Sequence, residues 1–170
     1  MARFAAIYGH FLNVLRAISG IVVFAIFVLI VVDVFVRLVG LPPWLYSSIL
    51  VEYGLLWFTM LAAPYLVRIK GHVYIDAVTQ MLPPAAQRVF AKIAYVICIA
   101  SSVVFAYYSW TLLVDAYVNN QIDTRAVDMP LWSLLFPIPF CFVLVALEFL
   151  RFLIGIDSMY GDRTDVRDSV

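Results

Sequence analysis

Residues 17–39 read AISGIVVFAIFVLIVVDVFVRLV and contain no charge before Asp33. A helix that crosses the hydrocarbon core of a bilayer needs about 20 mostly apolar residues. This stretch supplies them when the helix continues past Asp33 and Arg37. The apolar run is longer than that of a usual signal peptide, and no small-x-small cleavage site follows it. It therefore predicts a retained transmembrane helix.

Three further apolar runs follow along the chain. The first contains one charge, Glu52, and the uncharged cores of the others lie at 93–114 and 129–147. None alternates polar and apolar side chains as the strands of a membrane barrel do. We expect an all-α integral membrane protein, a single domain over residues 1–170, with spans at about 17–39, 45–67, 93–114 and 129–154 and a polar tail at about 157–170.

The composition agrees with a membrane location. The chain is 65% hydrophobic and 13% charged, whereas soluble domains are nearer half apolar and a quarter charged. It has no basic block, which argues against nucleic acid as a partner. Cys98 and Cys141 lie inside apolar runs without a metal-binding or redox spacing. We expect no catalytic residue, no metal and no cofactor, and therefore not an enzyme.

The distribution of positive charge predicts the topology. Nine of the eleven Lys and Arg residues fall on the side of the N-terminus, and only Arg37 and Arg125 fall on the other. Cytoplasmic loops carry the excess of Lys and Arg in membrane proteins, so both termini are expected in the cytoplasm. Aromatic residues that favour the membrane interface gather toward the predicted outer side: Trp44, Tyr46, Tyr107, Tyr108, Trp110, Tyr117 and Trp132.

Prolines mark the ends of the outer segments. Pro42 and Pro43 are expected to stop the first helix, and Pro130 suits the first turn of the fourth. Pro137 and Pro139 lie deeper in the fourth span. Proline removes a backbone donor and collides with the preceding turn, so these two residues predict a kink.

A short amphipathic segment separates the second and third spans. Apolar residues of 72–82 recur with helical spacing, while His72 and Asp76 share the opposite face. We expect a short helix lying in the cytoplasmic interface, with Arg68 and Lys70 extending to the lipid headgroups. A His72–Asp76 acid–base or metal pair is the alternative, although a metal site usually needs three or four ligands.

Two stretches resemble a known family. They are VFVRLVGLPPW (34–44) and LLWFTMLAAPYLVRIKGHVYIDAVTQMLPP (55–84). They resemble the small membrane subunit of TRAP transporters (tripartite ATP-independent periplasmic transporters), the DctQ-like family. The matching elements, in order, are Arg37, Pro43–Trp44, Trp57, Arg68, Gly71–His72, Asp76 and Leu82–Pro83. The resemblance covers about residues 33–90. An acidic pair that the family often carries would fall near Ser48 and Ile49, which are not acidic, and its role is not transferred to Glu52.

The resemblance implies a non-catalytic subunit in the bacterial inner membrane, within a three-part symport system for uptake of solutes such as organic acids. A large multispan membrane subunit would move the substrate with an ion gradient, usually sodium, after a periplasmic substrate-binding protein captures it. The small subunit would pack against the large one and stabilise it. Candidate interface or membrane-anchoring residues are Asp33, Arg37, Trp44, Glu52, Trp57, Arg68, Lys70, His72 and Asp76.

Charges inside the spans leave alternatives open. Asp33 and Arg37 are four residues apart on one helix face, and Glu52 begins the second span at a similar depth. They are interpreted as a charge-neutral cluster near the outer headgroups, as a contact with partner subunits, or as part of an ion path. Glu148 and Arg151 predict a local ion pair.

Other functions fit less well. A self-contained small ion channel or transporter would use Asp33, Glu52 or Asp115. A haem carrier would need several axial ligands, commonly histidines, and the chain has only His10 and His72. The small subunit of a tripartite tricarboxylate transporter is a related possibility.

Overall fold

A computed structural model describes residues 2–42, 46–69, 84–124 and 128–154. Its elements are α1 (Ala2–Leu38), α2 (Ser47–Arg68), α4 (Pro84–Val118), β1 (Ile122–Asp123), β2 (Met129–Pro130), α5 (Leu131–Leu135) and α6 (Pro137–Leu153). Four helical segments are long and apolar enough to cross a membrane, α5 and α6 together forming the fourth. This confirms the predicted all-α class and span count. The predicted helix at 72–82 and the tail at 157–170 lie outside the described residues.

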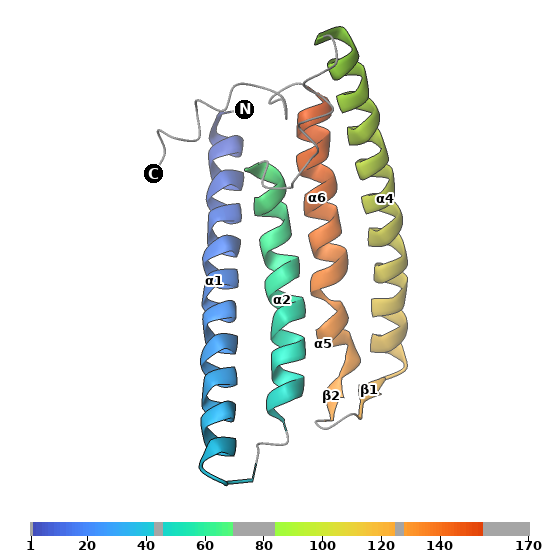
Figure 1. Cartoon of the computed structure of the whole chain (residues 1–170). Helices are drawn as coiled ribbons and strands as arrows, with labels where there is room; N and C mark the ends of the chain where they lie inside the picture. The colour runs from blue at the N-terminus through green and yellow to red at the C-terminus, as the bar shows by residue number, and fades with distance from the viewer. Residues whose placement is uncertain (1, 43–45, 70–83, 125–127, 155–170) are drawn as a thin grey trace.

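The four segments stand side by side in a layer (Figure 1). Its order is α1–α2–α6–α4, because α1 packs on α2, α2 on α6, and α6 on α4. We call the end that holds the start of α1 and the end of α2 the terminal end, and the opposite end the loop end. The short antiparallel ladder of β1 and β2 lies at the loop end, where Ile122 pairs with Pro130.

Two helices extend well beyond the predicted spans. Helix α1 begins at Ala2 and α4 at Pro84, whereas the spans were expected to begin at 17 and 93. The apolar pattern marks the part of a helix that lies in hydrocarbon, and the backbone hydrogen bonds of a helix continue past that boundary. The ends of these helices are therefore not visible in hydropathy alone.

Both long helices end in the same backbone motif at the loop end. After α1, Gly40 has a φ of +79° and donates to the carbonyl of Arg37, while Leu41 donates to Val36. After α4, Asn120 has a φ of +46°, and Gln121 donates to the carbonyl of Ala116. This is the Schellman arrangement, which satisfies the last carbonyls of a helix and favours Gly or Asn at the left-handed position. Gly40 therefore ends the first helix before the prolines expected to stop it.

The fourth span is interrupted as the prolines predict. Helix α5 ends at Leu135 and α6 begins at Pro137, with Phe136 between them. Pro137 and Pro139 cannot donate to the preceding turn, so the helical hydrogen bonds stop there and restart. Pro130 lies at the N-cap of α5 in extended conformation, one residue before the first helical turn.

The buried core lies toward the terminal end. One cluster joins α1, α2 and α6 through Leu12, Leu15, Leu61 and Leu144. A second joins α2, α4 and α6 through Val67, Ala91, Tyr95, Phe149 and Phe152. Nearer the loop end, Gly54 permits close approach of α1, because a Cβ there would lie 2.8 Å from Cδ1 and Cγ1 of Ile26.

Burial is uneven across the layer. In the most apolar window of each span, 39% of the fourth segment is buried but only 6% of the first. Helix α1 is thus an edge helix, and many of its large apolar side chains, including Phe24 and Phe27, are exposed. Such a surface is stable when lipid or another membrane protein surrounds it.

Candidate functional site: ion-pair clusters at the two ends of the layer

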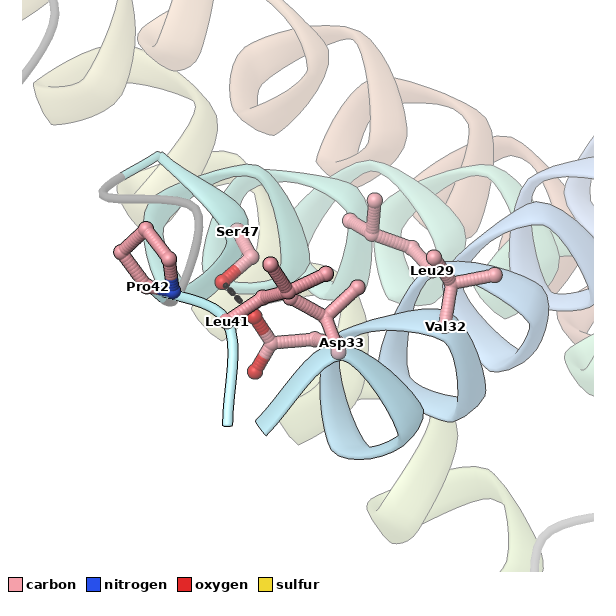
Figure 2. Close-up of a pocket in the computed structure, with 7 residues that line it drawn as sticks. Leu29, Val32, Asp33, Leu41, Pro42 and Ser47 are labelled. Atoms are coloured by element: carbon pink, nitrogen blue, oxygen red, sulfur yellow. Dashed lines mark hydrogen bonds between the residues drawn. The ribbon is translucent and has the colours of Figure 1, made fainter. Parts of the chain in front are cut away.

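The loop-end cluster joins α1 to α2 through a carboxylate. Nε of Arg37 donates to Oδ2 of Asp33 at 2.8 Å, which confirms the predicted i, i+4 pair. Oγ of Ser47, at the start of α2, donates to Oδ1 of the same carboxylate at 2.9 Å (Figure 2). Ser47 is buried, whereas Glu52 is exposed. The hydroxyl of Ser47, and not the carboxylate of Glu52, supplies the contact of α2 with Asp33.

A pocket of about 440 Å³ lies beside this cluster. Figure 2 shows Asp33 and Ser47 at the pocket, with aliphatic side chains around the rest of it. Leu41 and Val36 are joined by the Schellman hydrogen bond that ends α1, and both line the pocket. The lining residues are Leu29, Val32, Asp33, Val36, Leu41, Pro42 and Ser47.

Two further carboxylates organise the loop end. The hydroxyl of Tyr53 on α2 donates to Oδ2 of Asp123 at 2.6 Å, which ties the β1 segment to α2. Asp115 accepts from the side-chain amides of Asn119 and Gln121, just past its own helical turn. The contact of Tyr53 with Asp123 therefore holds the connection between the third and fourth spans, whereas the contacts of Asp115 are local to the end of α4.

The terminal-end cluster surrounds a fully buried carboxylate. Glu148 on α6 is 0% exposed, and its Oε2 lies 3.5 Å from Nη1 of Arg151, which confirms the predicted local pair. Tyr8 on α1 interacts electrostatically with Glu148, and its hydroxyl is buried. A buried charge is tolerated when opposite charges and donors surround it. Glu148 therefore fixes α6 beside the start of α1.

Arg68 completes the terminal-end cluster from α2. Its guanidinium carbon lies 6.0 Å from the ring centre of Tyr8. A Cβ placed on Gly9 would come within 3.0 Å of its Nη2, so the absence of a side chain at Gly9 makes room for the arginine. Its Nη1 is buried. The expectation that Arg68 extends to the headgroups stays a prediction; in the structure its guanidinium packs on Tyr8 and Gly9 of α1.

A separate cation–aromatic contact also joins α1 and α2. Nη1 of Arg16 donates to the hydroxyl of Tyr65 at 2.6 Å, and the guanidinium lies 5.0 Å from the centre of that ring. Such contacts between an arginine and an aromatic face are favourable when water is partly excluded. The contact thereby holds the charged guanidinium of Arg16 against α2 at the edge of the apolar region.

The remaining candidates fall into two groups. Trp57 is half-buried and packs on the cluster formed by Leu12, Leu61 and their neighbours, so it contributes to the internal packing of the chain. Trp44, Lys70, His72 and Asp76 lie outside the described residues. In the described part of the chain, no three His, Cys, Asp or Glu side chains are close enough to share a metal ion.

Sequence reasoning missed several members of these clusters. Tyr8, Gly9 and Ser47 were not singled out, and Glu148 was interpreted as a simple local pair. An acid that follows a long uncharged run on the same helix is a signal for burial, since a charge at that depth needs partners. Tyr8 and Ser47 carry no comparable local signal.

The arrangement defines the class of protein. It is a multi-pass membrane protein whose ionisable side chains, in the part of the chain that the structure describes, gather toward the two ends of the layer around an apolar middle. A family model described as "Tripartite ATP-independent periplasmic transporters, DctQ component" matches residues 26–157, well over half of the chain. The chain therefore belongs to the DctQ family, the small membrane components of TRAP transporters. No curated protein and no solved structure matches it.

Proposed function

We propose that this chain is the non-catalytic membrane subunit that packs against and stabilises the large transport subunit of a tripartite, sodium-driven symporter in the bacterial inner membrane. The large subunit carries the solute, such as an organic acid, and receives it from a periplasmic binding protein. The small subunit holds the large one in the bilayer. Family membership supports the tripartite context.

The observation that carries this proposal is the open order of the helices, α1–α2–α6–α4, in which α1 and α4 lie at the two edges. A closed four-helix bundle buries one face of each helix in a common core, whereas here α1 packs mainly on α2 and leaves most of its surface exposed. Apolar contact alone gains little in lipid, so association in membranes relies on packing and polar contacts. A row of helices with exposed apolar side chains and with charges at both ends suits lateral packing against a larger membrane protein.

The distribution of charge also argues against a self-contained transporter. Between Ser19 and Val32 on α1, between Tyr53 and Val67 on α2, and along residues 93–114 of α4, the sequence contains no ionisable Asp, Glu, Lys, Arg or His. Ion and proton pathways require such groups, or backbone carbonyls freed from helices, near the middle of the bilayer. The described helices run unbroken through these stretches.

Co-expression with the neighbouring genes tests the proposal. A tag on this chain is expected to recover a large multispan protein in a stable complex, and solute uptake in liposomes is expected only when that protein and the periplasmic protein are present. Liposomes that contain this chain alone serve as the control. Sodium-dependent uptake by the chain alone, or a folded chain that recovers no multispan partner, would contradict the proposal.

A further inference from the structure

We propose that the loop-end cluster and its pocket form a binding site for one phospholipid with a phosphoethanolamine headgroup. One acyl chain occupies the pocket, the phosphate binds Arg37, and the ammonium group binds Asp33. This inference concerns the isolated chain in a bilayer and does not depend on the proposed packing against a large subunit.

The pocket is suited to hydrocarbon. The pocket has a volume of about 440 Å³, and its described lining apart from Asp33 and Ser47 consists of aliphatic side chains and Pro42. An aliphatic wall left without neighbouring atoms forfeits dispersion contacts along its length. In a membrane, an acyl chain is the hydrocarbon at hand to fill the pocket.

The charged residues lie at the level where headgroups begin. Asp33 and Arg37 belong to the last two turns of the span Ile7–Leu38, and Ser47 is the first residue of the span Ser47–Arg68. Of the aliphatic lining, Leu29 and Val32 lie on the span side of this level, Val36 lies between Asp33 and Arg37, and Leu41 and Pro42 follow the end of α1. A lipid seated here would therefore place its chain and headgroup at their ordinary depths.

Arg37 offers unused donors for a phosphate. Its Nε donates to Asp33, and its side chain is 52% exposed. Among the described residues, no acceptor binds its two Nη atoms. A guanidinium presents this free edge as a planar fork that binds two phosphate oxygens together.

Asp33 offers acceptor capacity for an ammonium group. Its Oδ1 accepts from Ser47 and its Oδ2 from Arg37, and each carboxylate oxygen can accept more than one hydrogen bond. Its side chain is 16% exposed and lines the pocket. An adjacent carboxylate and guanidinium complement a headgroup with a positive and a negative charge. Phosphocholine lacks N–H donors, and phosphoglycerol lacks the cation.

Native mass spectrometry of the purified full chain tests the site. Micelles are doped with phosphatidylethanolamine, phosphatidylcholine or phosphatidylglycerol with identical acyl chains. We expect one phosphatidylethanolamine to be retained about tenfold more than either competitor, which corresponds to one charge-assisted hydrogen bond. Soluble phosphoethanolamine is expected not to displace the lipid, because the acyl chain contributes to binding.

Variants separate the parts of the site. Asp33→Asn keeps the contact with Ser47 and should abolish the preference over phosphatidylcholine. Arg37→Gln should lower retention of all three lipids. Leu29→Phe, which narrows the pocket without touching the ion pair, should also lower retention of all three. Asp115→Asn removes a loop-end carboxylate on α4, the opposite edge of the layer, and should change nothing.

Circular dichroism of each variant confirms that the helices are intact before retention is compared. Equal retention of the three lipids by the wild-type chain would overturn the proposal. So would an Asp33→Asn variant with unchanged selectivity, or displacement of the lipid by soluble phosphoethanolamine.

Discussion

Glu148 illustrates how one side chain can join helices that are distant in the sequence. Its carboxylate is fully buried on α6, with Arg151 one turn away and Tyr8 on α1 within electrostatic reach. Arg68 of α2 approaches the same tyrosine and packs on Gly9. Removing one partner from such a group lowers folding stability by more than the whole group contributes to it, because the remaining charges stay buried without a counter-charge.

Glu148→Ala is therefore expected to destabilise the chain. The loss should be about 3 kcal/mol, the lower end for breaking a buried ion pair, because the Arg151 side chain is still 28% exposed. Unfolding by SDS in mixed micelles measures it. Asp115→Asn, at an exposed carboxylate, is the matched control and should change stability little. A Glu148→Ala chain as stable as the control would show that the cluster does not hold the helices.

Gly54 makes a second residue-scale prediction. A methyl group at this position collides with Ile26 at 2.8 Å, whereas a methyl group at Gly20 meets nothing within 4 Å. Gly54→Ala should cost about 1–2 kcal/mol through overpacking, while Gly20→Ala should be neutral or stabilising through helix propensity.

A double-mutant cycle with Ile26→Ala tests the cause. In that background the colliding atoms are gone, so Gly54→Ala should no longer destabilise the chain. The same SDS titration provides the measurement. If Gly54→Ala lowers stability equally with Ile26 and with Ile26→Ala, its effect does not arise from the contact between α1 and α2.

At the scale of elements, two helices end at a residue in the left-handed backbone conformation, and the fourth span is interrupted by proline. Gly40 and Asn120 adopt positive φ after α1 and α4, while Pro137 divides α5 from α6. The stop at Gly40 brings Leu41 back over Val36, and both residues line the loop-end pocket. The position of a helix end thus determines the shape of a candidate binding site.

Replacement of these two left-handed residues should have opposite effects. Gly40→Ala is expected to cost about 1 kcal/mol, because a Cβ disfavours the left-handed region and nothing near it would clash. Asn120→Gly should be neutral or stabilising by a few tenths of a kcal/mol, since glycine enters this region more readily. SDS titration of both variants measures the difference. If Gly40→Ala unfolds no earlier than Asn120→Gly, backbone strain does not govern these ends.

At the scale of the whole molecule, α1 is an edge helix and much of the apolar surface is exposed. The described spans bury little of their own surface, from 6% to 39% of each apolar window. Such a chain depends on its surroundings for most of its contacts. Its orientation decides which end faces the periplasm, and hence which leaflet contains the loop-end pocket.

Cysteine accessibility tests the predicted orientation. In a Cys98→Ala, Cys141→Ala background, Thr124→Cys is exposed directly after β1, the strand at the loop end, and Ser169→Cys lies in the C-terminal tail. A membrane-impermeant maleimide added to intact spheroplasts should label Thr124→Cys only. After lysis it should label both. Labelling of Ser169→Cys before lysis would reverse the topology inferred from Lys and Arg.

The sequence by itself determined the class of protein and the number of spans. Hydrophobicity is a property of consecutive residues, so the four spans, the i, i+4 pair of Asp33 with Arg37, and the break near Pro137 are all readable along the chain. The ordered motifs from Arg37 to Pro83 also identified the family, which the match over residues 26–157 confirms.

Only the tertiary structure decided which helices are neighbours and which charges are buried. The contacts of Asp33 with Ser47, of Arg16 with Tyr65 and of Tyr53 with Asp123 join residues 14, 49 and 70 positions apart. No local pattern encodes such pairs, because they depend on how the helices pack and rotate. The packing of Arg68 on Tyr8 and the full burial of Glu148 could not be read from the sequence for the same reason: a side chain's surroundings are supplied by other helices.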